Sequence, residues 1–271
     1  MRVALISQVT PAVVGYSQLL TALGHEPVGV LCVRTGSRYA MLGQHVEESP
    51  PELDFVIPSS RERFVPLMRS LEPDLAICLG FPWKLNAEMI AAPRLGTVNT
   101  HPSLLPRYRG PNPVGWAIRN GETEIGMTFH WMEPELDTGA ILAQEAIPLD
   151  DEHTWDELTP KFVDVVGRLM PAAMARVEAG DPGDPQDESE ATYQSFFEPE
   201  YVEIDWSRPR EEVARQVRAW HFAGRLDGEP GALTELDGER LRILRVSLEP
   251  CEGREVECGD GSVWIVESER I

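Results

Sequence analysis

The segment DLAICLGFPWKLNAEMIAAPRLGTVNTH, residues 74–101, decides the fold class. Its apolar start, DLAICLG, predicts a buried β-strand that ends at Gly80. The stretch LNAEMIAA then predicts a short helix over residues 85–92, and GTVNTH predicts a second strand over 96–101 whose far end is polar. Strands that alternate with helices in this way are typical of a mainly parallel sheet with helices on both faces.

The same alternation extends outward from this segment in both directions. Further strands are predicted at residues 3–7, 26–33, 124–132 and 139–149, and further helices at 10–24, 61–71, 113–121 and 154–178. Pro66 is expected to kink or shorten the helix that contains it. We therefore expect an α/β, Rossmann-like fold whose ligand site lies beyond the carboxyl ends of the strands.

The composition changes after residue 180. Residues 180–195 are acidic and rich in Gly, Pro and Ser, which predicts a linker. A helix and several short strands follow, near residues 209–221, 232–238, 240–248 and 261–268. We expect three parts, namely a large domain over residues 1–180, an acidic linker over 181–198 and a small mostly-β domain over 199–271.

The formal net charge of −21 bears on the possible partners. Nucleic-acid affinity rests mainly on Lys and Arg side chains that neutralise phosphates, so this charge argues against RNA, DNA and anionic membranes. No apolar run approaches the roughly 20 residues that a membrane span needs, and the first residues, MRVALISQV, read as a strand and not as a signal peptide. We therefore expect a cytoplasmic protein without a membrane partner.

The four cysteines predict no metal site. Cys32 and Cys78 lie in apolar, strand-like runs, where a free thiol behaves as a small hydrophobic group. Cys251 and Cys258 lack the spacing of a zinc site, and a disulfide between them stays open.

The polar end of the strand at 96–101 is the candidate site. Side chains alternate along a strand, so Asn99 and His101 point in the same direction. Asp137, in the turn LDTG between two predicted strands, could return a carboxylate to the same place. Together these residues supply an oxyanion donor, a general acid or base and a group that orients it.

Two other interpretations of these residues are open. A single histidine at a strand end is more often structural than catalytic. The D-T-G triplet is also found in aspartic proteases, but those enzymes need a second such triplet to share a proton, and the chain has none.

The run NTHPSLLPRYRGPNPVGWAIRNGETEIGMTFHWMEPELDTGAILAQ, residues 99–144, resembles the folate-dependent formyltransferase family. The elements N-x-H, S-L-L-P-x-x-R-G and D-T-G occur in the family's order and spacing. The resemblance implies 10-formyltetrahydrofolate as co-substrate, no metal and a C-terminal barrel-like (OB-like) domain. It implies that Asn99 and His101 stabilise charge on the formyl oxygen, while Asp137 assists His101 and helps remove the amine proton.

The same resemblance implies further contacts. Folate contacts are expected from Phe81, Trp83, Leu85, Met132, Glu133 and Leu136. Ser103 is expected to hold the turn after the strand, Arg109 is a candidate for substrate binding, and Gly110 is expected to let the backbone approach the substrate.

The identity of the amine acceptor is approached by exclusion. The chain lacks the Gly/Ser-rich phosphate loop of the family's glycinamide ribonucleotide enzymes after its first strand. Its acidic linker has the wrong sign for tRNA. We therefore expect a small or carrier-bound amine as acceptor, such as an amino sugar, a hydroxyornithine or an aminoacyl group, in a monomer or homodimer. The alternatives are methionyl-tRNA as acceptor, or water, as in the formyltetrahydrofolate hydrolases.

Overall fold

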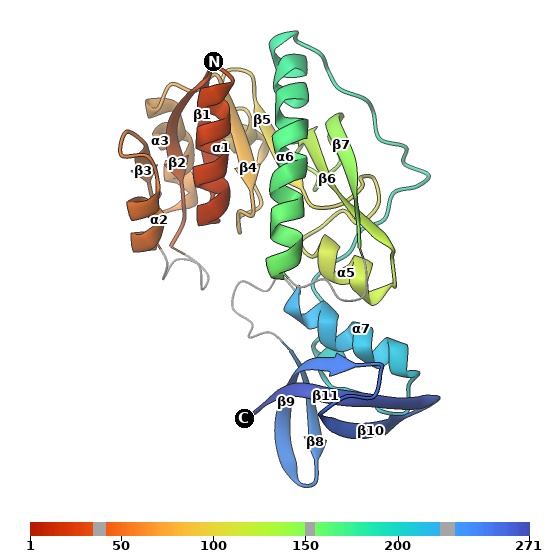
Figure 1. The fold of residues 1–271 in the computed structure, drawn as a ribbon. Coiled ribbons are helices and arrows are strands. Elements are labelled where there is room, and N and C mark those ends of the chain that lie inside the picture. The colour runs from red at the N-terminus through yellow and green to blue at the C-terminus, as the bar shows by residue number, and fades with distance from the viewer. Residues whose placement is uncertain (35–41, 150–154, 223–230) are drawn as a thin grey trace. The chain divides into compact units, whose positions relative to one another are not determined.

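The computed structural model describes residues 1–34, 42–149, 155–222 and 231–271 (Figure 1). The chain divides into two compact units. The first comprises Met1–Arg109, Gly126–Ala146 and Phe162–Thr192, and the second comprises Gly110–Ile125, Ile147–Lys161 and Tyr193–Ile271. Within the described residues, no helix combines the length and the apolar character that crossing a membrane requires.

A seven-stranded sheet runs in the order β3-β2-β1-β4-β5-β6-β7. Its strands are β1 (Arg2–Ser7), β2 (Glu26–Leu31), β3 (Asp54–Val56), β4 (Leu75–Leu79), β5 (Thr97–His101), β6 (Glu124–Trp131) and β7 (Ile141–Pro148). The pairs β2–β3, β1–β2, β1–β4 and β4–β5 are parallel, whereas β5 and β6 pair antiparallel. The predicted mainly parallel sheet is thus confirmed. The sequence did not predict β3, which is too short for a periodicity signal.

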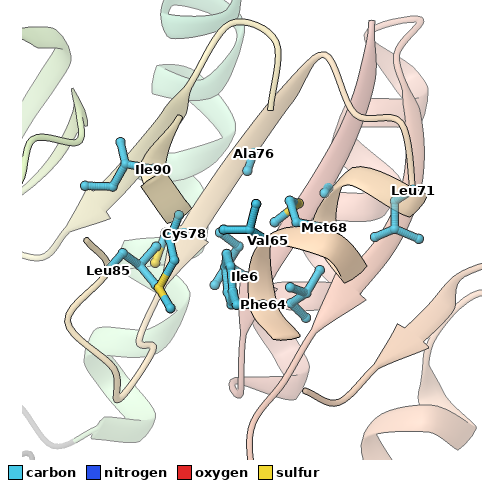
Figure 2. Packing of buried hydrophobic residues seen from close by; sticks show 12 residues of the cluster. Ile6, Phe64, Val65, Met68, Leu71, Ala76, Cys78, Leu85 and Ile90 are labelled. Carbon is cyan, nitrogen blue, oxygen red and sulfur yellow. The ribbon is translucent and has the colours of Figure 1, made fainter. Parts of the chain in front are cut away.

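Helices cover both faces of this sheet. On one face, α1 (Thr10–Ala22) places the Tyr16 hydroxyl 3.2 Å from the hydroxyl of Thr100 in β5. On the other face, α3 (Phe64–Ser70) packs Phe64 and Met68 against the buried side of β1 and β4 (Figure 2). Burial of a side chain the size of Phe64 contributes about 2–3 kcal/mol to stability.

Two predicted helices are shorter in the structure. The helix expected over 61–71 is a 3₁₀ turn at Arg61–Arg63 followed by α3. Pro66 therefore lies in the first turn of α3, where its missing N–H needs no partner. The helix expected over 85–92 is α4 (Ala87–Ile90), whose first turn is capped by the Asn86 side chain. The long helix α6 spans Trp155–Glu178, and residues 150–154 lie outside the described residues.

The second unit contains α5 (Pro113–Arg119), α7 (Arg210–His221) and a four-stranded antiparallel sheet in the order β10-β11-β9-β8. These strands are β8 (Ala232–Leu236), β9 (Glu239–Ser247), β10 (Arg254–Cys258) and β11 (Gly261–Arg270). The small mostly-β domain is confirmed. The sequence did not predict β10, because its outward side chains are charged and leave a weak apolar pattern. All four cysteines are free thiols, so Cys251 and Cys258 do not form a disulfide with each other.

Candidate active site

Strand β5 brings Asn99 and His101 to the carboxyl edge of the parallel strands. Asn99 pairs with Cys78 of β4 on one side and with His130 of β6 on the other. His101 is 5% exposed and Asn99 is half-buried. Both side chains leave the same face of the strand because one residue separates them.

The turn after β6 returns Asp137 to this edge. Asp137 has φ 58°, a left-handed conformation that Asp tolerates better than most residues. Two residues later, a Cβ on Gly139 would lie 1.8 Å from the carbonyl oxygen of Trp131, so only glycine fits there. The resulting turn holds one Asp137 oxygen, Oδ1, 3.4 Å from Asn99 Nδ2 and the other, Oδ2, 3.7 Å from His101 Nδ1. The structure thus brings the three predicted residues together.

The contacts of His101 show where its ring carries a proton. His101 Nε2 lies 2.8 Å from the backbone oxygen of Tyr108, which can only accept a hydrogen bond. Nε2 therefore carries a proton. The other ring nitrogen, Nδ1, faces the Asp137 carboxylate at 3.7 Å.

His130 is a site residue that sequence reasoning missed. Its Nε2 lies 3.2 Å from Asn99 Nδ2 and 3.7 Å from Asp137 Oδ1, while its Nδ1 donates to the backbone oxygen of Trp131 at 2.8 Å. Burial lowers the pKa of His130 to about 4, and the nearby Asp137 carboxylate opposes this shift. His130 is thus neutral near pH 7 and accepts a hydrogen bond from Asn99. A polar residue inside the apolar strand MTFHWM was the available signal.

The lowered pKa of His130 predicts a dependence of stability on pH. Between pH 6.5 and about 4 the unfolded chain binds a proton at this residue that the folded chain does not bind. This contribution to stability is complete above pH 6.5 and is lost as the pH falls toward 4. We expect the free energy of unfolding of the wild type to fall by about 2 kcal/mol from pH 7 to pH 5 because of His130. In His130→Gln, which has no group that titrates at this position, this part of the fall should be absent. Urea denaturation of both proteins at the two pH values measures it, and equal losses in both would contradict it.

Ser103, Arg109 and Gly110, in the segment after β5, each contact a different part of the chain. Ser103 Oγ donates to the Arg107 oxygen at 2.8 Å, so Ser103 closes the turn after β5. The Arg109 side chain is 8% exposed and already binds Glu188 and Gln186. A Cβ on Gly110 would lie 2.1 Å from the backbone oxygen of Gln194, so Gly110 allows a close approach within the chain.

The expected folate contacts separate into two groups. Phe81, Trp83 and Met132 are half-buried and pack on the cluster that contains Leu85. The rings of Phe81 and Trp83 lie 6.0 Å apart at 68°. Glu133 and Leu136, in contrast, are exposed in the turn before Asp137.

Among residues 1–34, 42–149, 155–222 and 231–271, no group of three or more His, Cys, Asp or Glu side chains could hold a metal ion.

Comparison with known proteins identifies relatives for both parts of the chain. The formyl transferase family model matches residues 30–174, and the model of the formyl transferase C-terminal domain matches residues 197–271. A methionyl-tRNA formyltransferase of Moorella thermoacetica is 38% identical over 202 residues, which are 72% of this chain and 63% of that protein. The chain spans between about half and two thirds of the length of the curated relatives it matches first.

Solved structures share the fold. A sugar N-formyltransferase from Shewanella sp. FDAARGOS_354 aligns with a TM-score of 0.70 at 19% identity, over 93% of this chain and 99% of that one. HypX from Aquifex aeolicus, in complex with tetrahydrofolic acid, aligns with a TM-score of 0.68 at 22% identity, over 100% of this chain and 44% of that one. At these identities the likeness concerns the fold alone.

Proposed function

The chain belongs to the formyl transferase family, and on this premise we propose that it transfers the formyl group of 10-formyltetrahydrofolate to an amine. The resemblance of residues 99–144 to that family is confirmed by the family model. The observation that carries the proposed activity is the convergence of Asn99, His101 and Asp137 at the carboxyl edge of β5.

The three side chains divide the work of the transfer. The folate supplies an activated formyl carbon, to which the amine nitrogen bonds while the bond from that carbon to the folate nitrogen breaks. Negative charge develops on the formyl oxygen during the transfer. The Asn99 amide gives up its long hydrogen bond to Asp137, at 3.4 Å, and donates instead to this oxygen. His101 stabilises the same charge from Nδ1 and delivers a proton to the folate nitrogen. Asp137 accepts the proton that the amine loses, so that the protons balance.

The apolar residues near the site fit a flat aromatic co-substrate. Phe81, Trp83 and Met132 are only partly covered by the chain, and they follow β4 and β6, the two neighbours of β5. Half-buried aromatic and sulfur-containing side chains are suited to contact a ring system such as a pterin. The exposed Glu133 and Leu136 lie in the turn that leads to Asp137 and are proposed as contacts only from the family resemblance.

For the acceptor, the sequence relatives support methionyl-tRNA better than the small or carrier-bound amine expected from the charge. Curated relatives at 32–38% identity include methionyl-tRNA formyltransferases of Moorella thermoacetica and Acidiphilium cryptum. The sugar N-formyltransferases are similar in fold at 17–19% identity. We therefore propose methionyl-tRNA as the first acceptor to test.

A small amine is the second candidate, and the charge of the C-terminal part favours it. Residues 197–271 hold 18 acidic residues against 10 arginines and no lysine, a net charge of −8. Carboxylates within 4.0 Å already pair with seven of these arginines, namely Arg208, Arg215, Arg240, Arg242, Arg245, Arg254 and Arg270. Paired arginines offer little to a phosphate backbone.

Release of tetrahydrofolate from 10-formyltetrahydrofolate tests the activity and the acceptor together. We expect release to be slow without an amine and fast with charged initiator methionyl-tRNA, with formylmethionyl-tRNA as product. If a small amine is formylated fast and charged initiator methionyl-tRNA is not formylated, the acceptor is the small amine. Fast release without any amine would contradict both and indicate a hydrolase.

A further inference from the structure

We propose that Gln186 is a positioning residue that sets the place of Asp137 in the site. The inference rests on the proposed formyl transfer, because it assigns a role in that reaction to a residue outside the site. Gln186 lies in the acidic stretch that the sequence predicts as a linker, 49 residues after Asp137. In the structure this stretch belongs to the first unit as far as Thr192.

The side-chain amide of Gln186 uses its full hydrogen-bonding capacity. Its nitrogen donates to the backbone oxygens of Asp137 and Gly139, both at 2.8 Å. Its oxygen accepts from the Nε and Nη2 atoms of Arg109, at 3.1 and 2.7 Å. An amide has two donor hydrogens and two acceptor lone pairs, so each of them has a partner.

This amide spans the turn that carries the catalytic carboxylate. The two oxygens that it binds flank Thr138, and they belong to the residues that give the turn its shape. Asp137 is left-handed, and Gly139 allows no side chain. A turn held at both ends cannot rotate its first residue freely. The direction of the Asp137 carboxylate toward His101 therefore depends on Gln186.

Arg109 is the anchor behind Gln186. Its buried guanidinium binds Gln186 on one side and both carboxylate oxygens of Glu188 on the other, at 2.6 and 3.0 Å. A planar guanidinium fixes the plane of the groups that it binds in this forked way. Arg109 thus acts on the site through Gln186.

The same stretch also holds the other partner of His101. The Thr192 hydroxyl accepts from the backbone N–H of Tyr108 at 2.8 Å, and the Thr192 oxygen accepts from Arg109 N–H at 2.9 Å. The oxygen of Tyr108 is the group that binds His101 Nε2. Residues 186–192 therefore fix the groups that face both nitrogens of the catalytic imidazole.

Two substitutions of Gln186 separate positioning from simple packing. Gln186→Met keeps the length of the side chain and removes every hydrogen bond. Gln186→Glu keeps the acceptor for Arg109 but places a second oxygen against the oxygens of Asp137 and Gly139. Glu190→Gln, an exposed neighbour, is the control. A displacement of the order of 1 Å can cost about 10²-fold in rate.

We expect both Gln186 variants to lower kcat about 10- to 100-fold with an unchanged KM for 10-formyltetrahydrofolate, and the control to match the wild type. In an Asp137→Asn background, Gln186→Met should lower the remaining single-turnover rate less than twofold, because its effect acts through Asp137. Restoration of kcat by Gln186→Glu, or a full additional loss in the double variant, would overturn the proposal.

Hydrogen exchange of the backbone amides around residues 137–139 tests the proposal without any substrate. We expect faster exchange there in Gln186→Met than in the wild type or the control. Unchanged exchange would contradict the proposed role of Gln186 even in an active enzyme. Absence of formyl transfer by the wild type, with altered exchange in the variant, would contradict the proposed function and not the positioning.

Discussion

His101→Gln is expected to lower kcat by about 10²–10⁴-fold and to change the Kd for 10-formyltetrahydrofolate less than threefold. Glutamine can place its amide nitrogen where His101 Nε2 lies, and can therefore keep the hydrogen bond to the oxygen of Tyr108. It has no group equivalent to Nδ1, which faces Asp137 at 3.7 Å. The variant thus separates the fold of the loop from the proton chemistry of the imidazole.

Turnover, folate affinity and thermal unfolding of the purified variant measure this separation. We expect the melting temperature of His101→Gln to stay close to that of the wild type, while His101→Ala loses both the activity and part of the stability of the loop. The control for a histidine outside the site is His221→Gln, in α7 of the second unit, which should retain full activity. Activity retained in His101→Gln would remove His101 Nδ1 from the reaction.

The fold and the centre of the site follow from local patterns. Residues 74–101 predict strand, helix and strand because apolar runs and turn residues are read over a few positions. Alternation along β5 then places Asn99 and His101 on one face. The LDTG turn between two predicted strands makes Asp137 a candidate for the same place, and the family resemblance adds its specific role, since an aspartate 38 residues away from Asn99 carries no local signal of its partner.

The parts that the sequence did not reveal depend on pairing between distant segments. His130 enters the site only because the antiparallel register of β6 sets it opposite Asn99. A register shifted by one residue would turn this histidine to the other face. The composition of residues 180–195 predicts a solvated linker, yet Gln186 and Thr192 form hydrogen bonds with the backbone of Asp137 and Tyr108 in the first unit. Composition describes the average environment of a segment and does not identify the single side chains that hold a distant loop.

The acceptor shows how two physical signals can point in different directions. Relatives at 32–38% identity are methionyl-tRNA formyltransferases, which favours tRNA as acceptor. The arginines of residues 197–271 that pair with carboxylates leave little positive charge for the phosphates of a tRNA, which favours a small amine. Binding of tRNA by the chain would therefore need groups other than these paired arginines. Its salt dependence would be shallow, since the slope follows the number of phosphates that are neutralised.

Asp137→Asn is expected to lower kcat by about 10²–10⁴-fold, with a melting temperature within a few degrees of the wild type. Asparagine tolerates the left-handed backbone at φ 58° and keeps the shape of the carboxylate. It loses the negative charge that faces His101 Nδ1 and His130 Nε2, and the ability to accept the amine proton. The loss should therefore lie in turnover and leave folding intact.

The pKa of His130 offers a second readout of the same substitution, independent of activity. Asp137 is the group that opposes the lowering of this pKa by burial, so its neutralisation should lower the pKa of His130 below that of the wild type. Histidine NMR titration below pH 6 measures this shift. Asp237→Asn is the matched control, because Asp237 has φ 53° in the exposed turn before β9 and should leave both kcat and the His130 titration unchanged. If Asp137→Asn lowered kcat but left the His130 titration in place, the carboxylate would act on the substrate alone, and the charge coupling inferred for this site would be wrong.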